Sequence, residues 1–211
     1  MAHTDSGTII LLNGTASSGK TSLAKALQQT FDEPYLLVGI DVFWERIFPW
    51  GWAGAASASW QHRPIHEASP PKTAIVMTPF AHFLHSGLHH TVATLARIGH
   101  NVVVDHVLYA APDLDECLTL WQALPVWLVG VHCPLDVVRQ RAVMRTDRSG
   151  WKEYLEVVSW QYEEVHKHTR GIYDIEVDTS RLSPAECAVQ IKDALRASGQ
   201  PRAFRQLTAF T

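Results

Sequence analysis

The chain has 211 residues, of which 46% are hydrophobic and 18% charged, a composition that excludes a disordered protein and is typical of a folded domain. Its formal net charge of -3 excludes a general attraction to nucleic acids or anionic membranes, so any phosphate must be bound by a local group of basic side chains. We expect one α/β domain over residues 1–211, without nucleic-acid or membrane partners.

No apolar run approaches the length of a membrane-spanning helix, and the three cysteines are far apart without a CxxC pair. Both observations favour a cytoplasmic protein with reduced thiols. The sequence is compatible with a homo-oligomer. The twelve histidines show no HExxH pattern, and we interpret most of them as surface or packing residues.

The first apolar run ends in a glycine loop. Residues 8–22 read TIILLNGTASSGKTS, which is a strand, the pattern GxxxxGKT and the start of an amphipathic helix. In this setting the pattern is typical of a phosphate-binding loop, the alternative being an ordinary Gly/Ser turn. The glycines would adopt dihedrals that a side chain resists, so that N–H groups turn toward an anion. We predict that a nucleoside triphosphate is bound by Gly14, Thr15, Ala16, Ser17, Ser18, Gly19, Lys20, Thr21 and Ser22.

Within this loop, two side chains have separate predicted roles. Lys20 would bind the β- and γ-phosphates, and the Thr21 hydroxyl would coordinate Mg²⁺. The next predicted strand covers residues 35–40, and Asp41 stands at its carboxyl end. Ligands of open parallel sheets gather outside the carboxyl ends of the strands, so Asp41 can meet a substrate. It can equally cap the following helix, and the two roles can coexist.

From Phe43 to Ala74 the regular pattern breaks down, and half of the chain's eight tryptophans lie there among Pro, Gly, Ala and Ser. A long irregular segment in a compact domain usually covers a site. Its aromatic side chains favour a pocket for an organic, non-nucleotide substrate; an oligomer interface and a loop packed on the sheet are the alternatives. We predict that Phe43, Trp44 and Trp52 line this acceptor pocket.

A long helix is predicted for residues 79–97 and a buried strand for residues 101–105. The strand ends in Asp105, which gives it the form of a Walker B strand whose aspartate holds Mg²⁺. A short helix over residues 114–124 and a strand over residues 126–132 follow.

In residues 134–148, Arg141, Arg145 and Arg148 recur at i, i+4 and i+7. If the helix persists, they form a basic stripe on one face. Planar guanidinium groups suit phosphate oxygens, so the stripe would bind the triphosphate, with a solvated surface stripe as the alternative. Beyond it, we expect a helix over 151–168, a strand over 172–179 and a helix from Ser183 to about Ser198, with a peripheral tail after Gly199.

These motifs, taken in order, resemble those of the chloramphenicol phosphotransferase family, small P-loop kinases that phosphorylate a hydroxyl of an antibiotic. The matching stretches are residues 10–14, 19–21, 39–41, 102–105, 127–133 and 173–179, together with Arg141, Arg145 and Arg148. The resemblance implies a three-layer α/β/α P-loop fold with five parallel strands in the order 2-3-1-4-5 and a helical lid at about 139–152. It also implies ATP and Mg²⁺ as cosubstrates and Asp41 as the base at the acceptor hydroxyl.

The sequence departs from the family pattern in two places. His106 stands where a second acidic residue is expected after Asp105, and the Trp-rich segment 43–74 follows the family poorly. We place Asp105 and His106 beside the acceptor pocket, with Asp41. Because the variable segment would form the pocket, the resemblance supports the reaction better than it supports chloramphenicol as the acceptor.

The sequence therefore predicts transfer of the γ-phosphoryl group of ATP to a hydroxyl of a small organic acceptor, such as an antibiotic. Lys20, Asp41, Arg145 and Arg148 would be catalytic, Arg141 and Arg145 would contact the nucleotide, and Thr21 and Asp105 would hold Mg²⁺. One alternative is a metabolite or nucleotide-sugar kinase of the shikimate kinase or zeta toxin type. Another is a nucleotide-dependent switch without an acceptor.

Overall fold

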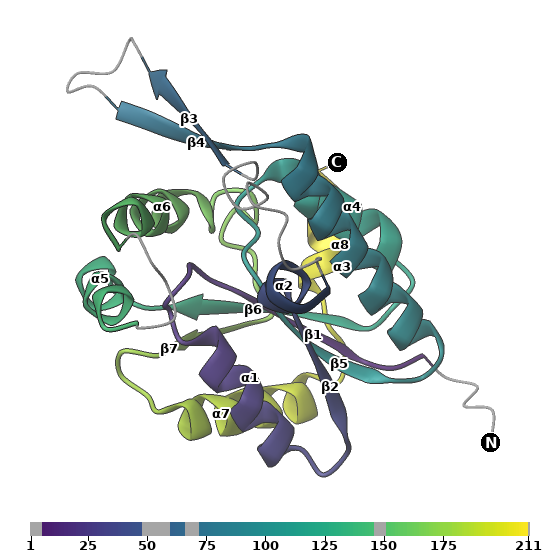
Figure 1. The fold of residues 1–211 in the computed structure, drawn as a ribbon. Helices are drawn as coiled ribbons and strands as arrows, with labels where there is room; N and C mark the ends of the chain where they lie inside the picture. Colours follow the sequence, from purple (N-terminus) through teal and green to yellow (C-terminus); the bar gives the residue numbers. More distant parts are fainter. Residues whose placement is uncertain (1–5, 48–59, 66–71, 146–150, 211) are drawn as a thin grey trace.

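The computed structural model describes residues 6–47, 60–65, 72–145 and 151–210. Its centre is a parallel sheet of five strands in the order β2-β5-β1-β6-β7. The strands are β1 (Ile9–Asn13), β2 (Tyr35–Gly39), β5 (Asn101–His106), β6 (Val126–His132) and β7 (Ile175–Asp178). Numbered along the chain among themselves, they follow the expected order 2-3-1-4-5; the labels differ because a hairpin lies between β2 and β5 (Figure 1).

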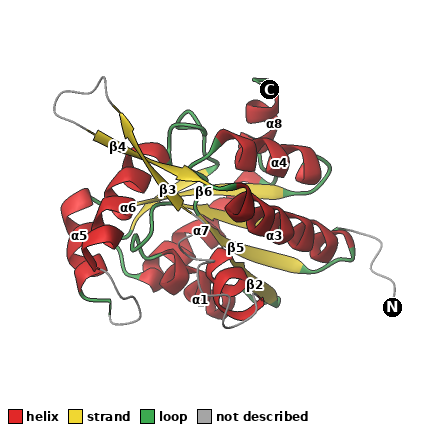
Figure 2. Ribbon diagram, turned by 45° about the horizontal axis from the view of Figure 1, so that its top comes forward, coloured by secondary structure: helices red, strands yellow, loops and turns green. Residues whose placement is uncertain are grey.

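Helices cover both faces of this sheet, which confirms the α/β/α class (Figures 1 and 2). On one face lie α1 (Lys20–Thr30) and α7 (Pro184–Ser198). On the other lie α3 (Pro79–Arg97), α4 (Ala111–Trp121) and α8 (Ala203–Thr208). Beyond the carboxyl ends of the strands, α5 (Leu135–Val143) packs against α6 (Trp151–Glu164).

Two hydrophobic cores follow from the alternation of side chains along the strands. Ile10 and Leu12 face α1 and α7, whereas Ile9 and Leu11 face α3, α4 and α8. The central strand β1 is buried along its whole length. Because of this alternation, two consecutive residues at the end of a strand point to opposite faces of the sheet. Consecutive polar residues such as Asp105 and His106 therefore have different neighbours.

The tail after Gly199 is part of the core, contrary to our expectation. In α8, Ala203, Phe204 and Leu207 are buried in the cluster that contains α3 and α4. The Phe204 ring stacks on the fully buried indole of Trp121, with 6.0 Å between ring centres and 13° between planes. Three apolar residues within five positions form too short a pattern to predict a helix from the sequence.

The expectation of an irregular segment over residues 43–74 was wrong in part. After the short helix α2 (Ile40–Val42), Phe43–Ile47 form a π-helical turn. Strands β3 (Trp60–Ile65) and β4 (Lys72–Met77) then pair as an antiparallel hairpin. Pro64 within β3 obscured the strand pattern, and a two-stranded sheet tolerates a proline because each strand has a free edge.

Several smaller expectations can be compared with the structure. Ser183 and Glu186 form the capping box expected at the start of α7. Cys117, Cys133 and Cys187 are free and buried. Among the described residues, no helix combines the length and the apolar character needed to cross a membrane.

Candidate active site

The register of the sheet brings the predicted site residues to one edge. Gly39 of β2 pairs with Asp105 of β5, and Asp105 pairs with Leu12 of β1. The glycine loop that follows β1, the helix α2 that holds Asp41, and Asp105 therefore all lie at the carboxyl ends of adjacent strands. Thr21 and Asp105 are 84 residues apart in the sequence, yet the sheet makes them neighbours.

The two loop glycines are needed for different reasons, and we predicted only one of them. Gly19 has φ 97°, in the left-handed region that a side chain resists. Gly14 is not among the residues with positive φ; a Cβ there would lie 2.5 Å from the Val131 carbonyl oxygen of β6. Close approach to the neighbouring strand therefore excludes a side chain at Gly14, and Ser17 provides a second left-handed turn at φ 64°.

Lys20, Thr21 and Asp105 form a compact polar cluster at the start of α1. The Lys20 Nζ donates to the Thr15 carbonyl oxygen at 2.9 Å and lies 3.8 Å from Asp105 Oδ1. The Thr21 hydroxyl donates to Asp105 Oδ2 at 2.5 Å. Adjacent ligands of an octahedral Mg²⁺ lie about 2.9 Å apart. The Thr21 hydroxyl and the Asp105 carboxylate are therefore close enough to coordinate one Mg²⁺ together.

Some of the loop amides that we expected to bind phosphate have partners within the protein. The Ala16 N–H donates to Gln161 Oε1 at 3.2 Å, and the Ser18 N–H donates to the Thr15 carbonyl oxygen. The Ser18 hydroxyl, in contrast, is buried without a hydrogen-bond partner. An unsatisfied buried hydroxyl is costly, and a ligand in the loop would remove that cost.

Helix α6 lies directly against the loop. The Thr15 hydroxyl donates to the Val158 carbonyl oxygen at 3.3 Å, and the hydroxyls of Ser17 and Tyr154 are 3.2 Å apart. These contacts, with that of Gln161, were not expected from the sequence. The sequence of α6 does not predict these contacts, because hydroxyl and amide side chains are also common on exposed helix faces.

Arg141 is tied to the loop rather than presented on an open face. Its guanidinium donates to the Thr179 carbonyl oxygen at 2.8 Å, to the Thr179 hydroxyl at 3.1 Å and to the Ser18 carbonyl oxygen at 3.4 Å. The Thr179 hydroxyl in turn donates to the Ser18 carbonyl oxygen at 2.5 Å. Arg141 and Thr179 thus connect α5 and the end of β7 to the loop.

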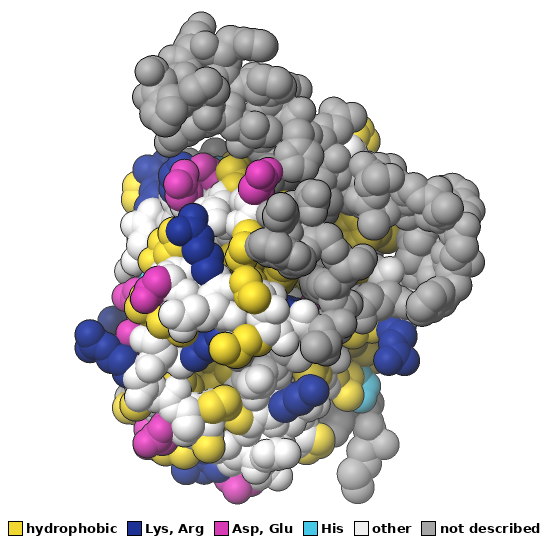
Figure 3. Space-filling model, turned by 60° about the vertical axis from the view of Figure 1, so that its left-hand side comes forward, with side chains coloured by type: hydrophobic (Ala, Val, Ile, Leu, Met, Phe, Trp, Pro, Cys, Tyr) yellow, Lys and Arg dark blue, Asp and Glu magenta, His cyan; other side chains and the backbone are white. Residues whose placement is uncertain are grey.

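The arginine stripe depends on a helix that ends too early. Helix α5 ends at Val143, and Arg145 follows it with its N–H bonded to the Ala142 carbonyl oxygen. The spacing of four residues therefore does not place Arg141 and Arg145 on one helical face. Arg148, and residues 146–150 of the predicted lid, lie outside the described residues. In the described part of the face shown in Figure 3, acidic and basic side chains are mixed rather than gathered by sign.

Asp41 lies in α2, immediately beyond β2, as expected from its position after the strand. Phe43, predicted to line the pocket, is instead buried in the hydrophobic core beside Gly87 of α3, because the turn after α2 directs it inward. Trp44 is partly buried against a cluster of Met77, Ala81, Val107, Tyr109 and Val165, with Trp160 beside it. Trp52 lies outside the described residues.

His106 does not lie with the acceptor pocket. It follows Asp105 along β5, so its side chain points to the opposite face of the sheet, where it is fully buried against His89 of α3. Asp105 faces α1 and contacts Thr21. The prediction failed because we considered position along the chain and not the alternation within the strand.

A family model described as "Chloramphenicol phosphotransferase-like protein" matches residues 7–196. The chain belongs to the chloramphenicol phosphotransferase-like family. A relative from Mycobacterium tuberculosis H37Rv, whose name proposes an O-phosphotransferase, is 28% identical over 98% of this chain and 90% of its own length. The family identifies the chain as a P-loop phosphotransferase.

Solved structures of kinases share the fold. The APS kinase CysC of M. tuberculosis, in complex with AMPPNP and APS, superposes with a TM-score of 0.60 at 15% identity, over 91% of this chain and 99% of that chain. A gluconokinase from Sinorhizobium meliloti gives a TM-score of 0.56 at 16% identity, over 96% of this chain and 94% of that chain. At such identities the likeness concerns the fold alone.

Asn13, the last residue of β1, holds neighbouring loops in position, a role that the sequence analysis did not predict. Its side chain is fully buried, and its Oδ1 accepts the Leu108 N–H at 2.8 Å. Its Nδ2 donates to the Val165 carbonyl oxygen and to the Tyr173 hydroxyl. Asn13 thereby joins the loop after β5 to the turn after α6. The only signal was a polar residue at the end of an apolar strand, immediately before the glycine loop.

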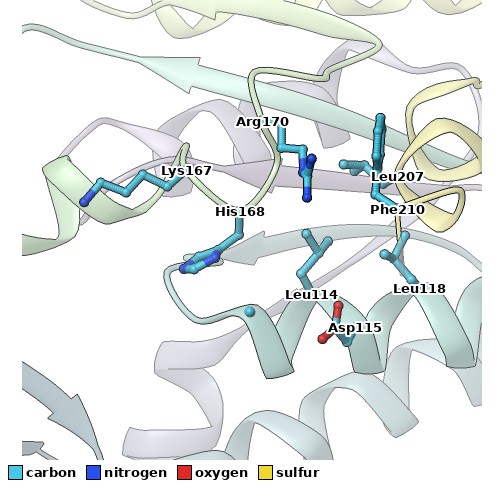
Figure 4. Close-up of a pocket in the computed structure, with 9 residues that line it drawn as sticks. Leu114, Asp115, Leu118, Lys167, His168, Arg170, Leu207 and Phe210 are labelled. Carbon is cyan, nitrogen blue, oxygen red and sulfur yellow. The ribbon is translucent and has the colours of Figure 1, made fainter.

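A separate pocket of about 200 Å³ lies away from the glycine loop, between α4, the turn after α6 and α8 (Figure 4). Its walls include Leu114, Leu207 and Phe210, and the Arg170 guanidinium lies 4.5 Å from the centre of the Phe210 ring. None of the residues predicted to bind nucleotide or acceptor lines it. We therefore assign the pocket no part in the reaction.

Proposed function

We propose that this protein transfers the γ-phosphoryl group of ATP to a hydroxyl group of a small, neutral organic acceptor, with Mg²⁺ as cofactor. The observation that carries the proposal is the cluster of Lys20, Thr21 and Asp105 at the N-terminus of α1. It combines a cation, a hydroxyl and a carboxylate beside a helix N-terminus, which is the donor set that a magnesium-bound triphosphate requires.

When bound, Mg²⁺ would neutralise charge on the β- and γ-phosphates and hold them in one orientation. Lys20, now bonded to Thr15, would turn to the phosphates as a point charge, while Thr21 and Asp105 bind the metal. Arg145 and Arg148 are proposed to stabilise charge on the transferring group. Arg141 would hold the loop and Thr179 in place near the nucleotide.

Asp41 is the proposed base. Its carboxylate would accept the proton of the acceptor hydroxyl while the hydroxyl oxygen bonds to the γ-phosphorus and the bond from that phosphorus to the bridging oxygen of ADP breaks. Its place in α2, beyond the strand paired with β5, supports this role. The bound acceptor must keep water away from the γ-phosphate, because water that reached it would hydrolyse ATP.

The proposed acceptor class rests on the aromatic side chains that pack beside Trp44, three residues after Asp41. Trp44 and Trp160 are partly buried beside Met77 and Tyr109, and the rings of Tyr109 and Trp160 are 5.0 Å apart. Segment 43–74 contributes only Arg46, Arg63 and Lys72 as cations, which favours an acceptor without phosphate or carboxylate groups. An aromatic antibiotic fits this description, and the name of the family supports it.

An acceptor screen tests the proposal. ADP release is measured with Mg²⁺ and ATP, alone and with neutral aromatic alcohols, chloramphenicol among the first, and each mixture is searched by mass spectrometry for one added phosphoryl group. Stimulation by a neutral acceptor supports the proposal. Stimulation only by shikimate-like acids or nucleotide sugars would favour the metabolite-kinase alternative, and ATP binding without any stimulated turnover would favour the switch.

A further inference from the structure

A group of histidines and carboxylates, all buried except the partly exposed Glu116, lies between α3, α4 and the end of β5. It consists of His85 and His89 on α3, His106 on β5, and Asp113 and Glu116 on α4, and we call it the histidine cluster. His85, His89, His106 and Asp113 are each at most 2% exposed. The phosphotransfer reaction uses none of them. Such a concentration of ionisable groups in a hydrophobic core needs a reason.

One part of the cluster is a directed chain of hydrogen bonds from Glu116 through His89 to His106. Glu116 Oε2 lies 2.5 Å from His89 Nδ1, and His89 Nε2 lies 2.9 Å from His106 Nε2. A carboxylate oxygen is an acceptor, so Glu116 accepts the hydrogen bond from the proton on His89 Nδ1.

The direction of the chain fixes the tautomer of His106. A neutral imidazole carries one N–H and one lone pair, so the two ring nitrogens of each histidine have opposite hydrogen-bonding roles. With its proton on Nδ1, neutral His89 has a lone pair on Nε2 and must accept from His106 Nε2–H. The remaining nitrogen, His106 Nδ1, then carries a lone pair. That atom is buried and has no hydrogen-bond partner.

The other part of the cluster supplies two more donor atoms. His85 Nδ1 lies 2.8 Å from Asp113 Oδ2, and the His85 and His106 rings are 5.0 Å apart. One donor atom each of His85, His106 and Asp113 lie within 4.8 Å of one another.

We propose that His85, His106 and Asp113 bind one divalent transition metal ion, with Zn²⁺ as the best fit. Two imidazoles and one carboxylate are ligands that Zn²⁺ accepts, at about 2.0–2.2 Å. Tetrahedral ligands at that distance lie about 3.4 Å apart, so the three groups need only a modest contraction. The ion would take the lone pair of His106 Nδ1, and the chain from Glu116 through His89 would orient His106 as carboxylate–histidine pairs orient metal ligands.

The three protein ligands would leave a fourth coordination position for water, and the ring of the ligand His85 lies 6.0 Å from that of Tyr109 in the proposed acceptor lining. The site would join α3 and α4 to β5 on the face of the sheet opposite Asp105, one residue away in sequence. Its outer neighbour His82, whose Nδ1 lies 3.1 Å from Asp113 Oδ1, has a side chain that is 37% exposed, so the cluster extends to the surface. Because it shares no side chain with the nucleotide site, the proposal stands or falls independently of the proposed function.

Equilibrium dialysis of the full chain against Zn²⁺, after removal of metals with a chelator and with excess Mg²⁺ present, tests the proposal. Metal is counted by mass spectrometry on wild type, His85→Gln, Asp113→Asn and two controls. His90→Gln changes an exposed histidine on the same helix, and Asp105→Asn removes the carboxylate of the nucleotide site. We expect one equivalent in wild type and both controls, and at least a tenfold loss of affinity in His85→Gln and Asp113→Asn.

A second measurement covers variants that fail to fold. In wild-type protein labelled with ¹⁵N-histidine, Zn²⁺ should shift the ring nitrogen signals of His85 and His106, and His89→Gln should weaken binding about 10–100-fold. The proposal is overturned if wild type takes up no stoichiometric Zn²⁺, if His85→Gln and Asp113→Asn bind it as wild type does, or if only Asp105→Asn loses it.

Discussion

The Thr21 hydroxyl donates a 2.5 Å hydrogen bond to the Asp105 carboxylate, and this bond joins the start of α1 to the end of β5. Asp105 also lies 3.8 Å from the buried ammonium of Lys20. Positive charge, hydroxyl and carboxylate thus meet at one point of the glycine loop. The relationship is the physical basis of the proposed Mg²⁺ site, because it places two hard oxygen ligands side by side before any ion is bound.

Asp105→Asn should lower the affinity for Mg²⁺ and reduce turnover by about 10²-fold or more, because an amide is a weaker ligand for a hard cation than a carboxylate. The measurement is the rate of ADP formation as a function of Mg²⁺ concentration. Thr21→Ser, which keeps the hydroxyl, is the control and should stay close to wild type. A Mg²⁺ dependence in Asp105→Asn equal to that of wild type would remove Asp105 from the metal site.

Asp41→Asn should lower kcat by about 10²–10⁴-fold while leaving ATP binding roughly unchanged, because only the acceptor proton is affected. Single-turnover kinetics with a stimulating acceptor, together with an ATP titration, separate the two effects. If kcat stays near the wild-type value, Asp41 is not the base; the helix-cap role that the sequence left open is wrong, because Gly39 is the N-cap of α2 and Asp41 lies in its first turn.

Gly14→Ala should destabilise the fold by about 1–3 kcal/mol, because the added methyl would lie 2.5 Å from the Val131 carbonyl oxygen. Gly87→Ala in α3 is the matched control: its φ is not positive, and its methyl would come no closer than 3.5 Å, to the Phe43 ring, so stability should not fall. Urea unfolding of the two variants measures the difference. Equal stabilities would show that strand β6 can move away from the loop.

Phe204→Ala should cost about 3–5 kcal/mol of unfolding free energy, since it leaves a cavity against the buried Trp121. Phe83, on α3 and 71% exposed, is the matched control, and its replacement by alanine should change stability by less than about 0.5 kcal/mol. Tryptophan fluorescence during urea unfolding provides the measurement. A small effect at Phe204 would mean that α8 is dispensable to the core.

Stability should fall as the pH decreases from 6.5 toward 4. Burial, with the neighbouring charges of His132 and Lys20, lowers the pKa of His166 from 6.5 to about 4. Between these values the unfolded chain binds a proton that the folded chain does not, so protonation favours unfolding. The contribution of His166 is complete above pH 6.5. His166→Gln should reduce the slope of urea midpoint against pH in this window, and an unchanged slope would contradict the assignment.

The sequence predicted best those features that depend on neighbouring residues. The bounds of α3 and β6 were predicted to the residue, because each has a long apolar period that ends at a Gly, a Pro or a polar residue. The loop was placed correctly between β1 and α1. For Thr21 and Asp105, the inference needed only the rule that the carboxyl ends of parallel strands meet.

Contacts between distant side chains could not be predicted. The partners of Asn13 lie 95, 152 and 160 residues away, and the sequence contains no sign of which they are. The histidine cluster did leave a signal that we missed: His82, His85 and His89 recur at i, i+3 and i+7 and so share one face of α3. We interpreted most of the histidines as surface or packing residues instead.

The most direct test of the central claim is a calorimetric titration of ATP into the purified chain, with and without Mg²⁺, for wild type and Lys20→Met. Methionine keeps an apolar side chain of similar length and removes the charge of Lys20 together with its hydrogen bond to Thr15. We predict binding by wild type that is tighter with Mg²⁺, and at least a tenfold weaker affinity in Lys20→Met. Absence of ATP binding by folded wild type in the presence of Mg²⁺, or equal affinities of the two proteins, would contradict a phosphate-binding role of the loop.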